Sequence, residues 1–228
     1  MVAIAVVLTL LLCLLADWWI QRRERQIRIP ATQAPFRGAS APVLLPPLHV
    51  GGFRFQTEMS YHPGHAWVFV EGPDRVRVGV DDFACRLLGE VERVDLPPVG
   101  LRVRQGRPAW TLLRNGRRAP MLSPISGRIV ELNPRVQTEP ALVRNDPYGE
   151  GWLFAVRADD LQSDLNNLLE GPLARRWLEE AGVRLSARLR EGIEISFADG
   201  GTAIPDIGSL IAEAEWMEVV REFLKTEA

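Results

Sequence analysis

The stretch Val76-Arg77-Val78-Gly79-Val80-Asp81-Asp82-Phe83-Ala84-Cys85-Arg86-Leu87-Leu88-Gly89 decides the fold class. Its first five residues alternate with period two, which is typical of a strand with one buried face. Asp81-Asp82 then predicts the cap of a short helix over residues 83–88, and Gly89 ends that helix. We therefore expect a β-strand that runs directly into a small helix.

Further short strands are expected on both sides of this unit. The sequence Asn115-Gly116 predicts a hairpin, because a type I′ turn needs positive φ at both central residues. Short strands at this spacing, together with one small helix, predict a compact sandwich or barrel. The expected strands are residues 67–70, 91–96, 101–104, 109–113, 128–132 and 152–156.

Six motifs follow one another between Tyr61 and Glu180. They are Tyr61–Val68 (YHPGHAWV), Val78–Ala84 (VGVDDFA), Leu88–Glu90 (LGE), Leu96–Gly100 (LPPVG), Ser123–Gly127 (SPISG) and Asn145–Leu153 (NDPYGEGWL). In this order they resemble the family of glycine cleavage system H proteins. The resemblance implies a mainly β, lipoyl-domain-like fold: a flattened sandwich of two small sheets, also called a barrel-sandwich hybrid, with small helices. It also implies structural roles for His65 and Trp67.

The resemblance implies a lipoyl carrier, and the sequence departs from it at the carrier position. The family holds lipoic acid on one lysine at a hairpin tip, a fixed distance before the Ser123–Gly127 motif, and that position falls on Gly116. Of the 27 basic residues, only Lys225 is a lysine. Arginine cannot replace lysine here, because amide formation needs a neutral amine and guanidinium stays charged. We therefore expect no lipoyl group and no other cofactor.

The composition excludes several other kinds of site. Two cysteines, Cys13 and Cys85, cannot supply a disulfide framework or a cysteine-based metal site. His62 and His65 lack the further ligands that a metal needs. A net charge of −2 gives no global attraction to nucleic acid. No cluster of titratable residues indicates catalysis, so we expect neither an enzyme nor a small-molecule substrate.

The N-terminus predicts a membrane anchor. Residues 1–16 carry no charge, Trp18 and Trp19 follow at the place of an aromatic belt, and Arg22, Arg23, Arg25 and Arg28 come next. A cleaved signal peptide would instead need basic residues before the apolar run. We therefore expect an uncleaved transmembrane helix over 1–20 in the cytoplasmic membrane, with the N-terminus outside and the rest in the cytoplasm.

Three further parts are expected after the anchor. Residues 21–52 form a basic and then proline-rich linker, which is either a plain tether or a strap lying on a partner. Residues 53–181 form the H-protein-like domain, including helices at 161–169 and 173–181. Residues 182–228 add strands at 183–190 and 193–197 and an amphipathic helix from about Ser209, which covers either the chain's own sheet or a partner's groove.

Two functions follow from this organisation. The first is a non-catalytic, single-pass accessory subunit of a membrane protein complex, respiratory or photosynthetic by analogy. The alternative is a decoy or regulatory docking module for enzymes that recognise H proteins, by attaching lipoate or transferring an aminomethyl group. The expected partners are the lipid bilayer and other protein subunits. The candidate partner contacts are Leu44, Leu45, Leu48, Phe53 and Phe55 in the linker region, Arg114, Arg117 and Arg118 at the hairpin tip, and Trp216 and Phe223 in the last helix.

Overall fold

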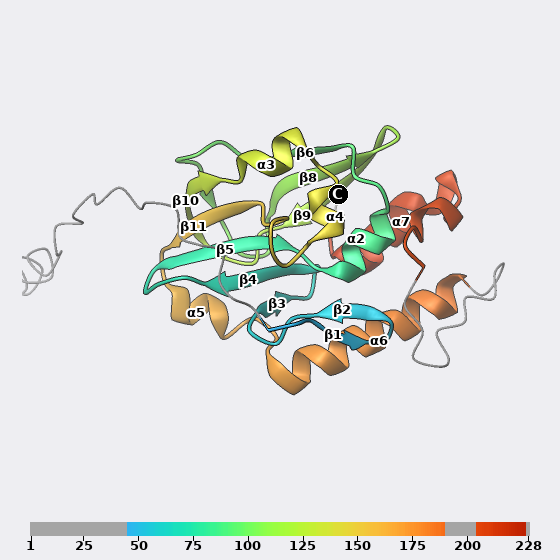
Figure 1. The fold of residues 1–228 in the computed structure, drawn as a ribbon, viewed down its shortest axis with the longest axis horizontal. Helices are drawn as coiled ribbons and strands as arrows, with labels where there is room; N and C mark the ends of the chain where they lie inside the picture. Colours follow the sequence, from blue (N-terminus) through green and yellow to red (C-terminus); the bar gives the residue numbers. More distant parts are fainter. Residues whose placement is uncertain (1–44, 190–203, 227–228) are drawn as a thin grey trace, which may run out of the picture. The chain divides into compact units, whose positions relative to one another are not determined.

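The computed structural model describes residues 45–189 and 204–226 (Figure 1). Within these two ranges, no helix combines the length and the apolar character needed to cross a bilayer. The predicted anchor over 1–20 lies outside the described residues, together with Trp18, Trp19, Arg22, Arg23, Arg25 and Arg28. Leu44 and the predicted strand 193–197 lie outside them as well.

The larger of the sheets has six antiparallel strands in the order β3-β4-β5-β11-β10-β7. Valines at alternate positions of β5 point into the core, while Arg75 and Arg77 face the other side. This alternation confirms the period-two prediction for residues 76–80. The strands are β3 (Ser60–His62), β4 (Ala66–Val70), β5 (Arg75–Val80), β7 (Arg102–Val103), β10 (Gly127–Leu132) and β11 (Phe154–Ala158).

A second sheet carries the predicted hairpin. It consists of β6 (Arg93–Asp95), β8 (Pro108–Arg114) and β9 (Arg117–Leu122), in the order β6-β8-β9. Asn115 has φ 47° and Gly116 has φ 75°, so both central residues of the turn adopt the left-handed conformation. The prediction of a two-residue turn is therefore confirmed, and Arg114 lies directly opposite Arg117 at its base.

Short helices connect the strands. The predicted helix is α2 (Asp82–Leu88), and the Asp81 carboxylate accepts a hydrogen bond from the Ala84 amide at 2.9 Å. Gly89, with φ 76°, ends the helix as predicted. The others are α3 (Pro134–Thr138), α4 (Leu142–Asn145) and α5 (Leu161–Leu165). The predicted helix 161–169 is thus shorter, because Leu169 pairs with Tyr61 through backbone hydrogen bonds.

The helix α6 (Gly171–Leu189) continues well beyond its predicted end. The prediction of a strand over 183–190 is wrong for residues 183–189. Ala174, Leu178, Ala181 and Leu185 are all buried, so one apolar stripe at helical spacing runs through the region. The stripe packs on strands of the domain, and these contacts stabilise helix where the local pattern favoured a strand.

Part of the predicted linker belongs to the domain. The strands β1 (Leu48–Val50) and β2 (Phe53–Phe55) form a hairpin between the six-stranded sheet and α6 (Figure 1). Phe53 packs on Phe83 with ring centroids 5.0 Å apart, and Phe55 stacks on Tyr61 at 4.9 Å. Phe53 and Phe55 therefore contact the chain's own core, which corrects their assignment as partner contacts.

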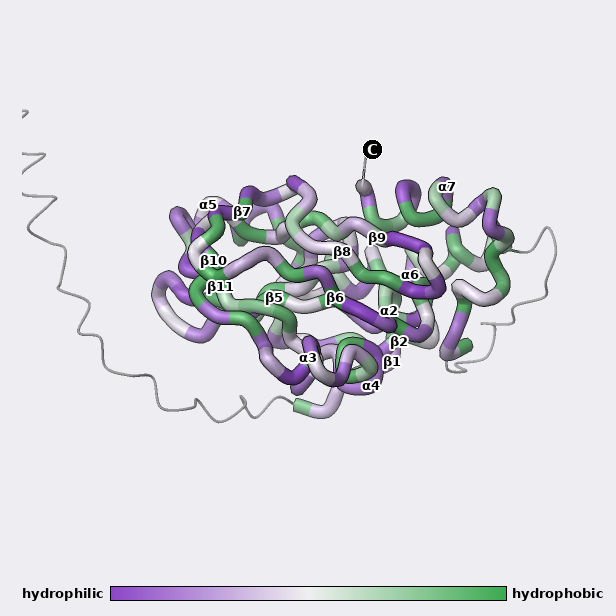
Figure 2. Tube along the Cα trace, turned by 90° about the horizontal axis from the view of Figure 1, so that it is seen from above, coloured by the Kyte–Doolittle hydropathy of each residue, from purple (hydrophilic) through white to green (hydrophobic). Residues whose placement is uncertain are grey.

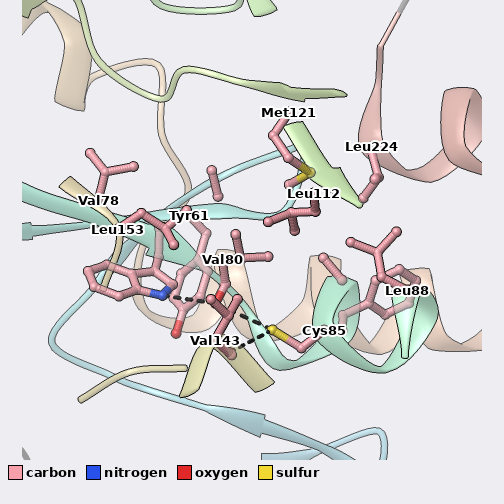
Figure 3. Packing of buried hydrophobic residues seen from close by; sticks show 14 of the residues in the cluster. Tyr61, Val78, Val80, Cys85, Leu88, Leu112, Met121, Val143, Leu153 and Leu224 are labelled. Atoms are coloured by element: carbon pink, nitrogen blue, oxygen red, sulfur yellow. Dashed lines mark hydrogen bonds between the residues drawn. The ribbon is translucent and has the colours of Figure 1, made fainter. Parts of the chain in front are cut away.

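One continuous core joins both sheets, α2, α6 and the C-terminal helix α7 (Glu213–Leu224). Figure 3 shows Val80 of the larger sheet, Leu112 and Met121 of the smaller sheet, and Leu224 of α7 around a common apolar interior. Cys85 lies in this interior, where its Sγ donates to the Val143 carbonyl at 3.1 Å and burial raises its pKa well above the usual value. Cys85 is completely buried, as expected for a small apolar residue on the inner face of α2.

The tightest approach in this core is that of Trp67 to Gly79 of the neighbouring strand. A Cβ atom at position 79 would lie 2.2 Å from Trp67 Cζ2. The indole cannot move aside freely, because its Nε1 donates to the carbonyls of Val80 and Pro147 at 3.0 and 3.1 Å.

We therefore predict that Gly79→Ala lowers the free energy of unfolding by at least about 1–3 kcal/mol, the usual cost of overpacking a core. Urea titration followed by tryptophan fluorescence measures this. Gly72→Ala is the matched control, since nothing lies within 4 Å of its Cβ position, and it should change stability by less than about 0.5 kcal/mol. Equal effects of the two substitutions would contradict the prediction.

Candidate functional site

The candidate site is the β8–β9 hairpin, whose base is fixed by arginines. Arg114 makes a bidentate pair with Asp206, with Nη1–Oδ1 at 2.5 Å and Nη2–Oδ2 at 2.6 Å. Its Nη1 also donates to the Leu88 carbonyl at 2.7 Å. Only 12% of the Arg114 side chain is exposed, so water screens this pair weakly. Arg114 thus connects the hairpin to both α2 and the chain near residue 206.

Arg117 on the opposite strand contacts the same C-terminal region. Its Nε donates to Glu213 at 2.6 Å and its Nη1 donates to the Gly208 carbonyl at 3.2 Å. The guanidinium lies over the ring of Trp216, 4.9 Å from the centroid, which is a cation–π contact. Charge and packing therefore act together on this side of the hairpin.

Residues 204–226, which we call the C-terminal segment, cover the hairpin base and α2. The segment contains a 3₁₀ turn, η1 (Gly208–Leu210), and α7. Trp216 and Phe223 are buried, and Phe223 packs against Phe83 with centroids 5.5 Å apart. These two predicted partner contacts therefore belong to the chain's own core. Of the two alternatives left open for the last helix, the structure has the one in which it covers its own domain.

The hairpin tip remains open to solvent. Asn115 and Gly116 are exposed, as is Arg118, whose side chain keeps 63% of its surface accessible. Of the three tip arginines, Arg118 keeps most of its side chain exposed, with the Asp95 carboxylate 4.0 Å away, whereas Arg114 and Arg117 pair with carboxylates of the C-terminal segment. Leu45 and Leu48, the remaining predicted contacts in the described region, are exposed near β1.

The tip offers no group for covalent attachment. Asn115 and Gly116 carry no nucleophile, and Lys225 lies just after α7, with φ 59°. In the described part of the chain, no group of three His, Cys, Asp or Glu residues could hold a metal ion. The hairpin can therefore present shape and charge, whereas attachment through an amide would need an amine that it lacks.

The two histidines of the YHPGHAWV motif have structural partners. His65 Nδ1 lies 2.7 Å from Asp81 Oδ2, and its ring stacks on Phe83 with centroids 4.1 Å apart. His62 Nδ1 accepts a hydrogen bond from the Gly64 amide at 3.0 Å. Burial, with a smaller contribution from His65, lowers the pKa of His62 to about 4. The folded loop therefore stabilises the neutral form of His62.

Comparison with known proteins assigns the family. The family model described as Glycine cleavage H-protein matches residues 59–181. The chain belongs to this family. The glycine cleavage system H protein of Coxiella burnetii (strain Dugway 5J108-111) is 35% identical over 116 residues, which cover 51% of this chain and 88% of that protein. That of Pectobacterium carotovorum subsp. carotovorum (strain PC1) is 38% identical over 123 residues, covering 54% and 94%.

A solved structure of an H protein is also similar to this chain in sequence. The crystal structure of a glycine cleavage system H protein from Mycobacterium marinum is 30% identical, covers 56% of this chain and 99% of that chain, and superimposes with a TM-score of 0.49. The matched family region ends at residue 181. The C-terminal segment and the β1–β2 hairpin therefore lie outside the part shared with the H-protein family.

Sequence reasoning missed the carboxylates that complete the site. Asp206 and Glu213 lie 92 and 96 residues from their arginine partners, so no local spacing connects them. The usable signal was indirect. Three arginines around a tight turn can pair with acids elsewhere in the chain, and both acids flank the apolar residues Ile207 and Ile211.

We predict that Arg114→Ala releases the C-terminal segment. The substitution removes both guanidinium hydrogen bonds to Asp206 and the one to the Leu88 carbonyl, and hydrogen bonds to charged groups contribute about 1.5–3 kcal/mol. Hydrogen exchange should therefore accelerate in peptides covering 207–224. Arg118→Ala is the control, because its exposed side chain should contribute less than about 0.5 kcal/mol. Unchanged exchange in Arg114→Ala would show that the segment is held without this pair.

A second prediction concerns pH. An unfolded histidine titrates near 6.5, so between pH 6.5 and 4 the unfolded chain binds more protons at His62 than the folded chain. Stability from His62 is thus complete above pH 6.5 and is lost as the pH falls towards 4, by up to about 3 kcal/mol. In His62→Asn, whose side-chain oxygen can still accept from Gly64, the denaturation midpoint should decline less over this range. A slope equal to the parent's would contradict the assignment.

Proposed function

We propose that this chain is a non-lipoylated docking module that binds enzymes recognising H proteins and competes with the lipoyl carrier for them. One observation carries the proposal. The match spans 88% and 94% of the length of the two H proteins named above, yet residues 59–181 contain no lysine. A chain of this kind keeps the recognisable body and omits the group on which the enzymes act.

The hairpin geometry supports this role. An enzyme that attaches lipoate must contact the hairpin tip, since that is where the family's lysine stands. Here the tip is a regular two-residue turn with both φ values positive, and Arg114 and Arg117 hold its base. The tip is therefore preorganised, which reduces the entropy lost on binding. A bound enzyme finds no amine, so the chain occupies the enzyme without being modified.

Inhibition kinetics test the proposal. With a carrier H protein as substrate, the full chain should raise the apparent KM of the lipoate-attaching or aminomethyl-transferring enzyme and leave kcat unchanged. The intact mass of this chain should stay constant during the reaction. If neither enzyme responds to a hundredfold excess over the carrier, the proposal is wrong.

A charge-reversal pair sharpens the experiment. Arg118→Glu changes the exposed tip and should weaken inhibition severalfold. Arg175→Glu makes the same change on α6, where the side chain is similarly exposed and pairs with Glu179. This control should inhibit like the parent. Equal loss of inhibition in both variants would show that the enzyme responds to the net charge of the chain and does not dock at the tip.

A second candidate, compatible with the first, is an accessory subunit held at the cytoplasmic membrane, with its domain in the cytoplasm. It is favoured by the uncharged residues 1–16 and by the arginines that follow at 22–28. Carbonate extraction of membranes from cells making the full chain distinguishes a chain that spans the membrane from one that does not. A spanning chain stays in the pellet, and release into the supernatant would remove this candidate.

A further inference from the structure

Three strands of the six-stranded sheet place arginines directly opposite one another. Arg128 of β10 is in register with Arg102 of β7 on one side and with Arg157 of β11 on the other. Figure 2 shows these three strands together at one end of the domain. Neighbouring strands lie about 4.8 Å apart, so the three side chains, which we call the arginine row, share one face within about 10 Å.

The other face of these strands explains the arrangement. Val103, Ile129 and Val156 are buried in the core, so the alternating residues must face outward. Like charges directly opposite each other are unfavourable, which makes three in a row unusual for a merely structural surface. The row is well exposed, with 60% of the Arg102 and 63% of the Arg157 side chain accessible.

The carboxylates near the row leave it available for another anion. Arg102 pairs with Asp159 and Arg157 pairs with Asp74 at 3.4 Å, all four side chains being exposed. Exposed pairs of this kind are weak and open to competition. The central Arg128 donates to a backbone oxygen, that of Gly100, at 2.7 Å. Arg104, also exposed, adds a fourth positive charge beside β7.

An apolar turn is fixed beside the arginine row. The amide of Leu101 donates to the Pro98 carbonyl at 3.2 Å, and Gly100 has φ 91°, which closes a tight turn. The Gly100 amide donates to the Ile129 carbonyl at 2.8 Å, so the turn is bound to β10 next to Arg128. Val99 and Leu101 are 58% and 49% exposed. Two exposed apolar side chains thus lie on a turn at the sheet edge that adjoins the arginine row.

We propose that the arginine row and the Pro98–Leu101 turn together form a surface that binds anionic lipid bilayers. The arginines would contact headgroup phosphates, and Val99 and Leu101 would enter the boundary between headgroups and acyl chains. Charge complementarity selects an anionic surface. The exposed aliphatic side chains select a bilayer over a nucleic acid, whose recognition uses stacking aromatic side chains or base-edge hydrogen bonds. This surface is on the larger sheet, so it does not depend on the docking role of the hairpin.

Hydrogen exchange of the full chain tests the proposal, with vesicles of phosphatidylcholine alone or with one third phosphatidylglycerol. Peptides covering 97–104 should exchange more slowly with the anionic vesicles only. The triple variant Arg102→Gln, Arg128→Gln, Arg157→Gln should lose this protection, because each arginine removed should lower the affinity for the anionic vesicles about fivefold. The control variant Arg175→Gln, Arg176→Gln, Arg184→Gln removes the same charge from α6 and should keep it. Exchange in β4 and β5 verifies that each variant is folded.

Several results would overturn the proposal. Equal protection by both vesicle types would show that charge is not recognised. Equal loss in the control variant would show a response to net charge alone. Protection by inorganic phosphate without lipid would indicate a small-anion site, and protection by an oligonucleotide but not by vesicles would indicate nucleic acid. Because the readout is local to residues 97–104, a membrane anchor elsewhere in the chain cannot produce the expected pattern.

Discussion

Two adjacent carboxylates, Asp81 and Asp82, are completely buried, and the arrangement of the domain follows from satisfying them. A buried charge is costly unless it is paired and hydrogen-bonded. Asp81 takes His65 as its partner, and Asp82 takes Arg54 and Arg86 at 2.7–2.8 Å. The partners come from β2, the loop before β4 and α2 itself. His65 is the side-chain partner of Asp81, and the two arginines share Asp82, so the cluster links these elements to one another.

The same cluster joins the H-protein body to the residues added before it. The Tyr148 hydroxyl donates to the Arg54 carbonyl at 2.7 Å and accepts from the Asp82 amide at 3.2 Å. Burial raises the pKa of Tyr148 well above its usual value, which keeps the hydroxyl protonated as a donor. Arg54 also donates to the Asn145 carbonyl at 3.0 Å. The NDPYGEGWL motif therefore contacts a strand that precedes the family match.

Local signals predicted the elements whose causes are local. The cap at Asp81, the stop at Gly89 and the Asn115-Gly116 turn each depend on a few neighbouring residues, and all three are present. The extension of α6 to Leu189 was not predicted from neighbouring residues in the sequence. It is stabilised by packing of the apolar stripe on strands far away in the sequence, and Gly182 fits closely there, since a Cβ atom would lie 3.2 Å from the ring of Phe53.

The candidate site shows the same division between local and distant causes. The sequence located the hairpin tip and its arginines, because turn residues and charges are visible in a short window. It could not tell that Arg117 reaches Glu213, since pairing over that distance is decided by the packing of α7 on the domain.

The β1–β2 hairpin also has a mechanical consequence. A load applied at Leu45 is resisted by the Gln56 hydrogen bond to its carbonyl, by the three residue pairs of this ladder and by contacts of β1 with α6, while Phe53 and Arg54 keep β2 in the core. Peeling β1 would lengthen the chain by about 3.3 Å per residue and leave the rest of the domain folded, so the hairpin acts as an extensible link.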